Sequence, residues 1–152
     1  MENHAKTISN REAFRDYAVL ETLECGIELK GSEVKSIRDG KANLKDSFAR
    51  VEAGEVLLYN VHISSYAQAS YLNVEPTRPR KLLLHRNQIL RLAGEVSQKK
   101  FTLIPLKFYF NKRGKVKVEL ALAKGKRLFD KREDLKQREI DMEVKRVMRR
   151  RR

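Results

Sequence analysis

The sequence predicts a mainly β domain in which short helices flank an antiparallel barrel and a basic tail follows at the C-terminus. Two observations carry this prediction: β-prone segments alternate in polarity, and turn residues separate them at short intervals. Five or six strands and two short helices within about 110 residues favour a small closed or nearly closed barrel. A two-layer α+β sheet is the competing architecture.

The first strands are read from β-prone runs bounded by glycine. One such run covers residues 17–26. Residues 44–52 and 55–64 form the next two, and Ala53-Gly54 between them is typical of a hairpin turn. These segments predict three consecutive antiparallel strands.

The last hairpin has the clearest pattern. Residues 104–110 and 116–122 both alternate in polarity, and Asn111-Lys112-Arg113-Gly114 supplies a four-residue turn between them. The alternation predicts one apolar face on each strand, made of Ile104, Leu106, Phe108 and Phe110 on the first and Val116, Val118, Leu120 and Leu122 on the second. Lysines face the other way, at Lys107, Lys115 and Lys117.

Two short helices interrupt the strands. Ser32 is a suitable N-cap for the first, which carries Val34 and Ile37 on one face and stops at Gly40. The second helix spans roughly residues 86–95 and has apolar side chains at helical spacing.

Charge is the unusual property of the chain. Thirty-four Lys and Arg against twenty Asp and Glu leave a formal net charge of +14. Residues 124–152 hold thirteen of those bases and six of the acids, so they carry half of the excess, and we divide the chain into a body, 1–123, and a tail, 124–152. An excess of this size is relieved when phosphates neutralise it, which indicates a nucleic-acid partner.

The tail combines helix-forming residues with a thin apolar stripe. Ile140, Val144 and Met148 follow one another at i, i+4 and i+8, and arginines end the chain. Such a helix has little apolar area with which to dock, and isolated helices of this length are marginal in water. We expect the tail to be disordered alone and helical when RNA phosphates neutralise it. A merely solubilising tail is the alternative.

Two basic clusters lie in the body. Arg78, Arg80 and Lys81 flank prolines that hold their loop extended, and a second patch ends the first helix with Lys35, Arg38 and Lys41. Taken singly, each of these cations is more often a solvated charge than a contact. Together with Tyr59, Tyr66 and Tyr71 they combine phosphate-binding cations with stacking rings, which favours a nucleic-acid partner but does not distinguish RNA from DNA.

No catalytic constellation accompanies these charges. The three histidines have no metal-ligand spacing, the single cysteine, Cys25, excludes a zinc pattern, and the glycines form no phosphate-binding motif. We therefore expect no enzyme, no metal and no cofactor. A lone cysteine and the absence of a signal peptide or a spanning segment predict a cytoplasmic protein with no membrane partner.

Three stretches together resemble the SsrA-binding protein (SmpB) family. Residues 24–43, ECGIELKGSEVKSIRDGKAN, are similar to that family's E-x-G-I-x-L-x-G-x-E-V-K-S-x-R-x-G-K-x-N stretch. Residues 80–85, RKLLLH, resemble its R-K-L-L-L-[HN] segment, and residues 123–132, AKGKRLFDKR, resemble its A-[KR]-G-K-[KR]-x-x-D-K-R ending. The stretches occur in the family's order, and the resemblance covers residues 10–148.

The resemblance implies an OB-fold barrel that grips the tRNA-like domain of transfer-messenger RNA (tmRNA, or SsrA RNA) in trans-translation, the rescue of stalled ribosomes. By motif position, Glu24, Leu83 and His85 correspond to the family's RNA-gripping residues, and the supporting contacts are Asn10, Arg11, Arg15 and Lys35. The further cations expected to bind tmRNA are Arg38, Lys41, Arg78, Arg80 and Lys81.

For the tail, the resemblance implies entry into the decoding centre and the empty mRNA channel of a stalled small subunit, in place of codon–anticodon pairing. The tail residues concerned are Lys124, Gly125, Lys126, Arg127, Phe129, Asp130, Lys131, Arg132, Val147 and Met148. Phe129 stands where the family often has His or Tyr, so a ring remains and a hydrogen-bonding group is lost. Delivery to the ribosomal A site implies elongation factor Tu with aminoacylated tmRNA as a further partner, and a monomer is expected.

Two other functions fit the residues alone. One is a ribosomal or general single-strand RNA-binding protein with an OB-like barrel, which would bind many RNAs with similar affinity. The other is a nuclease or RNA-modifying enzyme, which would require a metal or nucleophile site that the sequence lacks.

Overall fold

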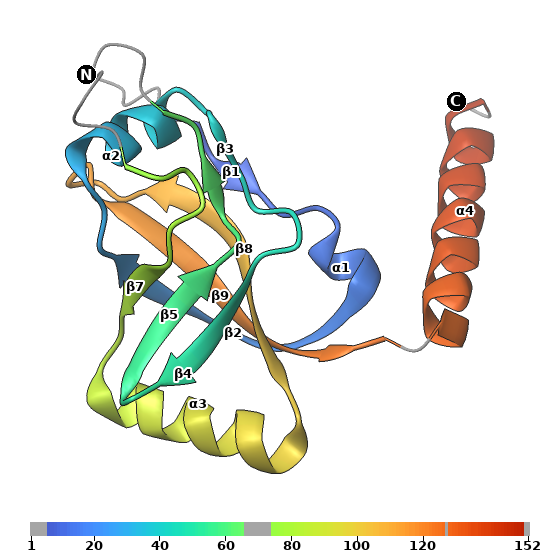
Figure 1. Ribbon diagram of the computed structural model, residues 1–152. Helices are drawn as coiled ribbons and strands as arrows, with labels where there is room; N and C mark the ends of the chain where they lie inside the picture. The colour runs from blue at the N-terminus through green and yellow to red at the C-terminus, as the bar shows by residue number, and fades with distance from the viewer. Residues whose placement is uncertain (1–5, 66–73, 127, 151–152) are drawn as a thin grey trace.

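A seven-stranded antiparallel sheet curls around the core of the protein (Figure 1). The computed structural model describes residues 6–65, 74–126 and 128–150. The strand order is β1-β8-β4-β5-β7-β2-β9, and β9 pairs with β8 as well, so the sheet closes on itself through six of its strands. This arrangement confirms the predicted barrel with flanking helices and removes the two-layer alternative.

Both the strands and the helices vary widely in length. The strands are β1 (Ile8–Ser9), β2 (Tyr17–Ile27), β3 (Ala42–Asn43), β4 (Phe48–Glu52), β5 (Glu55–Tyr59), β6 (His62–Ile63), β7 (Arg80–Leu83), β8 (Thr102–Phe110) and β9 (Val116–Gly125). The helices are α1 (Ala13–Asp16), α2 (Gly31–Arg38), α3 (Arg86–Lys99) and α4 (Leu128–Arg150). A separate two-stranded sheet joins β3 to β6.

Both predicted hairpins are confirmed. Ala53 and Gly54 have φ angles of 49° and 77°, the left-handed conformations that a tight two-residue hairpin turn requires. In the β8–β9 turn, Asn111 Oδ1 accepts hydrogen bonds from the backbone N–H groups of Arg113 (3.0 Å) and Lys115 (2.9 Å). These turns set the register of β4 with β5 and of β8 with β9.

The predicted single apolar face of β8 is wrong. Leu103 and Phe108 point into the main core, whereas Ile104 and Leu106 belong to a second cluster that packs against Ala13 of α1. The register between β8 and β9 shifts between Pro105 and Lys107, and a bulge of this kind reverses which face a strand presents. Apolar side chains therefore pack on both faces of the β8–β9 hairpin.

Helix α2 begins earlier than predicted. Lys30 is its N-cap and Ser32 lies inside the helix, because the buried carboxylate of Glu33 accepts a hydrogen bond from the Lys30 backbone N–H at 2.9 Å. Glu33 therefore supplies the acidic half of a capping box, while Lys30 at the N-cap is not a residue type that usually caps a helix. The second predicted helix is confirmed as α3, which continues four residues further, to Lys99.

Helix α4 stands apart from the barrel and lies nearest to α1 (Figure 1). Its apolar side chains are largely exposed: Ile140, Val144 and Met148 are 53%, 52% and 67% accessible. Arg138 Nη2 donates to the Phe14 carbonyl at 3.5 Å, a long hydrogen bond that holds the helix weakly. The thin stripe expected from the sequence is confirmed, and dependence of the helix on RNA stays a prediction.

Candidate nucleic-acid interface

Three of the predicted RNA-binding residues lie on or next to the pairing of β2 with β7. Gly26 of β2 faces Leu83 of β7 in the antiparallel register. Glu24 lies two residues before Gly26 on β2, and His85 lies two residues after Leu83 as the N-cap of α3. Glu24, Leu83 and His85 are all exposed, and Leu83 is 50% accessible. Segments that are far apart in the sequence therefore form one surface, which we call the β2–β7 face.

Gly26 makes room for Leu83 on this face. A Cβ atom at position 26 would lie 3.3 Å from Leu83 Cβ and 3.4 Å from its Cδ1, which is tighter than ordinary van der Waals contact. The absence of a side chain on β2 thus lets an apolar residue lie flat over the strand. An exposed apolar side chain beside a carboxylate suits an unpaired base better than a phosphate.

Neighbouring side chains hold the carboxylate of Glu24 in place. The hydroxyl of Tyr109, from β8, donates a hydrogen bond to Glu24 Oε2 across β9. Lys107 forms an ion pair with Glu119 at 3.3 Å, and its Nζ lies 5.4 Å from the centre of the Tyr109 ring. No sequence pattern indicated Tyr109, because its contact with Glu24 depends on the register of three strands.

The structure corrects the prediction that Arg80 is a surface cation in an extended loop. Arg80 opens strand β7 and is 1% accessible. Its guanidinium donates to Glu33 Oε2 (2.6 Å) and to the carbonyls of Val61 and Pro76 (2.8 Å each). Arg78 also donates to Glu33, at 2.5 Å. Arg80 is therefore a buried structural residue, and its hydrogen bond to Glu33 connects β7 to α2.

Glu33 is ionised at the centre of this cluster. Burial alone would raise its pKa, but hydrogen bonds from Arg78, from the Lys30 backbone and from Arg80 outweigh burial and hold the pKa below the usual value. Burial lowers the pKa of Arg80 while Glu33 opposes that change. A carboxylate shared by two arginines is the arrangement that makes a buried charge tolerable.

Asn10 is a second predicted contact that the structure places inside the protein. It is 6% accessible, and its side-chain nitrogen donates to the Pro105 carbonyl at 3.0 Å. This bond fixes the chain beside the β8 bulge. The nearby Arg11 and Arg15 are exposed, and Arg15 pairs with Asp16 at 3.3 Å.

The remaining cations of the body are spread over several elements. Lys35 and Arg38 are exposed on α2, and the Arg38 guanidinium lies 5.4 Å from the centre of the Phe110 ring. Lys41 is exposed just after that helix, and Lys81 on β7 pairs with Glu55 at 3.2 Å. Lys35 and Arg38 therefore lie three residues apart on one helix, and the patch that they were expected to form with Lys41 stays a prediction.

The predicted tail residues fall on both sides of the strand–helix junction. Lys124 and Gly125 are the last residues of β9, and the Lys126 backbone N–H donates to the Asp16 carbonyl at 3.0 Å. Arg127 lies outside the described residues. The first turns of α4 hold Phe129, Asp130, Lys131 and Arg132, and its last turns hold Val147 and Met148. One continuous helix thus links the two groups.

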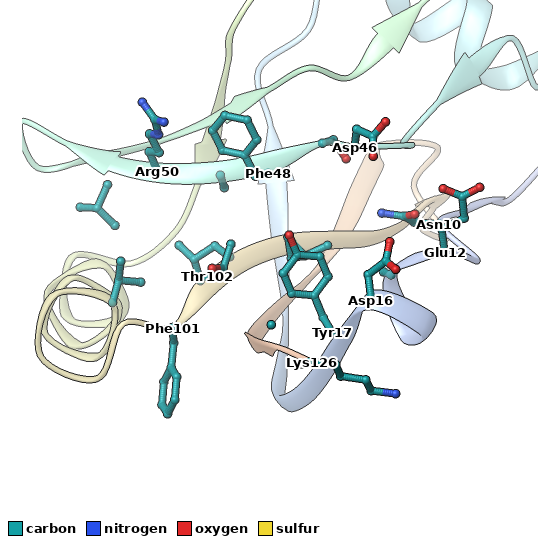
Figure 2. Close-up of a pocket in the computed structure, with 18 of the residues that line it drawn as sticks. Asn10, Glu12, Asp16, Tyr17, Asp46, Phe48, Arg50, Phe101, Thr102 and Lys126 are labelled. Atoms are coloured by element: carbon teal, nitrogen blue, oxygen red, sulfur yellow. The ribbon is translucent and has the colours of Figure 1, made fainter. Parts of the chain in front are cut away.

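A large open groove lies where β4 and β8 diverge, and no sequence pattern indicated it. It encloses about 1060 Å³ and is lined by both strands together with α1 and α3. Figure 2 shows Glu12, Asp16 and Asp46 at one end of it, with Arg50 and Phe101 toward the other. The groove therefore carries charges of both signs, since Arg50 and Lys126 line it as well as the carboxylates.

The described residues bear on three questions: metal binding, thiol chemistry and membrane spanning. No cluster of three or more metal-ligating side chains occurs among them. Burial raises the pKa of the Cys25 thiol to about 12, so the sulfur is not a thiolate near neutral pH. Within the described part of the chain, no helix is both long and apolar enough to cross a membrane.

Comparison with known proteins agrees with the fold. The family model described as SmpB protein matches residues 7–150. The SsrA-binding protein of Caldicellulosiruptor saccharolyticus is 62% identical over 140 residues, which is 92% of this chain and 88% of the relative. That of Moorella thermoacetica is 58% identical over 142 residues, covering 93% of this chain and 92% of the relative.

A solved structure has the same fold. It is described as "tmRNA-SmpB: a journey to the center of the bacterial ribosome", and one of its chains is 55% identical to this chain with a TM-score of 0.69. The alignment covers 82% of this chain and 87% of that chain. On the family match over nearly the whole sequence, and on relatives of this identity, the chain belongs to the SmpB family.

Proposed function

We propose that this protein binds the tRNA-like domain of tmRNA and carries it to stalled ribosomes in trans-translation. The observation that carries the proposal is membership of the SmpB family, whose relatives are named SsrA-binding proteins. The net charge of +14 fits a partner rich in phosphate. Binding, rather than catalysis, is the role.

In this proposal the β2–β7 face grips the RNA. Glu24 accepts a hydrogen bond from the RNA, Leu83 packs on an unpaired base, and His85 lies at the start of α3, where backbone N–H groups favour phosphate. Further cations, on several elements of the body, add to the attraction of phosphate: Arg11, Arg15, Lys35, Arg38, Lys41, Arg78 and Lys81. Arg80 and Asn10 act indirectly, because they position β7 and α1 from inside the protein.

We place the tail in the decoding centre and the empty mRNA channel of the small subunit. Helix α4 supports this role because it projects from the barrel, ends in basic residues and leaves its apolar side chains accessible. A projecting cationic helix can follow a channel lined by phosphates without disturbing the body. Elongation factor Tu with aminoacylated tmRNA completes the delivery complex, and the protein acts as a cytoplasmic monomer.

A competition experiment tests the RNA specificity. Labelled tmRNA bound to the protein is challenged with unlabelled tmRNA, ordinary tRNA and random RNA of equal length at fixed salt, because affinity without the salt concentration has no meaning. We expect only tmRNA to compete efficiently. Equal competition by all three would favour a general single-strand binder instead.

A truncation tests whether the body binds tmRNA and the tail acts on the ribosome. Removing residues 127–152 leaves every strand intact, so binding of tmRNA should change little while peptide tagging on stalled ribosomes is lost. An internal control is a variant in which Arg149 and Arg150 become Ala and the rest of α4 remains. Loss of tmRNA binding together with tagging would contradict a tail dedicated to the ribosome.

A further inference from the structure

Two carboxylates face one another on the exposed side of the sheet. Glu24 on β2 lies directly opposite Glu119 on β9, and Glu119 lies opposite Lys107 on β8. Like charges in opposite positions of adjacent strands repel. Lys107 draws Glu119 to itself with an ion pair of 3.3 Å, which leaves Glu24 to a different partner.

That partner is the hydroxyl of Tyr109, one row further along β8. Tyr109 faces Lys117 in the register and reaches across β9 to donate to Glu24 Oε2. Burial and the hydrogen bond to Glu24 raise the pKa of Tyr109, so the hydroxyl keeps its proton and stays a donor. Lys107 lies against the ring and holds it in place.

The contact engages only one oxygen of the carboxylate. Among the described residues, no hydrogen bond or ion pair reaches Glu24 Oε1, and Glu24 is exposed. An ionised carboxylate only accepts hydrogen bonds and repels phosphate. On RNA its partners are therefore base N–H groups and ribose hydroxyls.

We propose that Tyr109 is a positioning residue that presents the free oxygen of Glu24 to a hydrogen-bond donor of the RNA. This inference rests on the proposed binding of tmRNA at the β2–β7 face. Without the tyrosine hydroxyl, Glu24 can turn toward Lys107 or Lys117, and its free oxygen leaves the face. Tyr109 thus acts on affinity through Glu24 and makes no contact of its own.

A double-mutant cycle tests the coupling. Dissociation constants for the tRNA-like domain of tmRNA are measured for the wild type, Tyr109→Phe, Glu24→Ala and the double variant. We expect Tyr109→Phe to weaken binding about five- to tenfold, as for the loss of one charge-assisted hydrogen bond. In the Glu24→Ala background the same change should alter affinity less than twofold.

Tyr59→Phe is the matched control. Tyr59 also donates its hydroxyl to a glutamate, Glu52, at 2.9 Å, but it lies on β5, away from the β2–β9–β8 surface. The control should bind the RNA as the wild type does. A second readout is the salt dependence of binding: its slope counts phosphate contacts, so Tyr109→Phe should lower affinity without changing the slope. A variant in which this surface is disrupted would change both the affinity and the slope of the salt dependence.

Base and ribose donors are separated by analogue interference. The tRNA-like domain is prepared with scattered 2′-deoxy substitutions, or with base analogues that lack the amino group. A position that interferes with the wild type but not with Glu24→Ala identifies the donor as ribose or base. Interference that is identical in both proteins would contradict the claim that a hydrogen-bond donor of the RNA binds Glu24.

The remaining outcomes are distinct. If the wild type does not prefer tmRNA to ordinary tRNA, the proposed function fails. If the preference holds but Tyr109→Phe binds like the wild type, or weakens binding equally with and without Glu24, only the positioning role is overturned.

Discussion

Replacing Glu33 with glutamine should destabilise the protein severely without removing a single heavy atom from the core. The carboxylate of Glu33 accepts hydrogen bonds from Arg78 (2.5 Å), Arg80 (2.6 Å) and the Lys30 backbone (2.9 Å). An amide has one oxygen, so in Glu33→Gln one arginine must face an NH₂ group. The charge of Arg80, 1% accessible, is then left without a counter-charge.

The magnitude follows from the burial of this pair. Removing one partner of a buried ion pair costs about 3–5 kcal/mol, because the other charge stays buried. At about 2–4 °C per kcal/mol for a chain of this size, Tm should fall by roughly 6–20 °C. Urea unfolding followed by circular dichroism measures the free energy of unfolding, and a thermal melt measures Tm.

The matched control is Glu55→Gln. Glu55 pairs with Lys81 at 3.2 Å, but the two side chains are 49% and 42% accessible. Solvent screens such a pair, so we expect a loss of about 1 kcal/mol or less. If Glu33→Gln also lowered the free energy of unfolding by only about 1 kcal/mol or less, the argument that Arg80 is a structural cation would be refuted. Arg80 would then again be a candidate RNA contact.

Three further outcomes are expected. The stability that the depressed pKa of Glu33 contributes is present above its unfolded value of about 4.5 and is lost as pH falls through the lower folded value; acid titration of Glu33→Gln should lack this loss. A peptide of residues 126–152 should show little helix by circular dichroism and gain helix when RNA is added; a stable helix in buffer would contradict the conditional tail. Gly26→Ala should displace Leu83 and weaken tmRNA binding several-fold with a small change in Tm; unchanged affinity would remove Leu83 from the interface.

The sequence predicted elements whose signal is local. The β8–β9 turn was readable because Asn111 and Gly114 stabilise it by their own chemistry, and φ at Gly114 is 76°. The resemblance indicated Glu24, Leu83 and His85, which lie on or within two residues of the β2–β7 pairing of Gly26 with Leu83. In each case the responsible residues lie within a few positions of the feature, or within a continuous motif.

The features that escaped prediction depend on distant partners. Charge alone cannot tell that Arg80 is buried, because its solvation is replaced by Glu33, Val61 and Pro76. Alternation alone cannot tell that Ile104 and Leu106 face α1, since a one-residue bulge reverses the pattern. The Tyr109–Glu24 bond and the groove between β4 and β8 likewise exist only after the sheet has closed.

The position of β9 has a mechanical consequence. This strand pairs with β2 from Tyr17↔Gly125 to Gly26↔Lys117 and with β8 on its other side, and it leads directly toward α4. Traction on the tail along the strand axis would load both ladders in shear, so many hydrogen bonds would have to fail together. A pull at right angles would open them one at a time from Gly125. The tail is therefore anchored best against tension along β9, the direction in which the chain leaves the barrel.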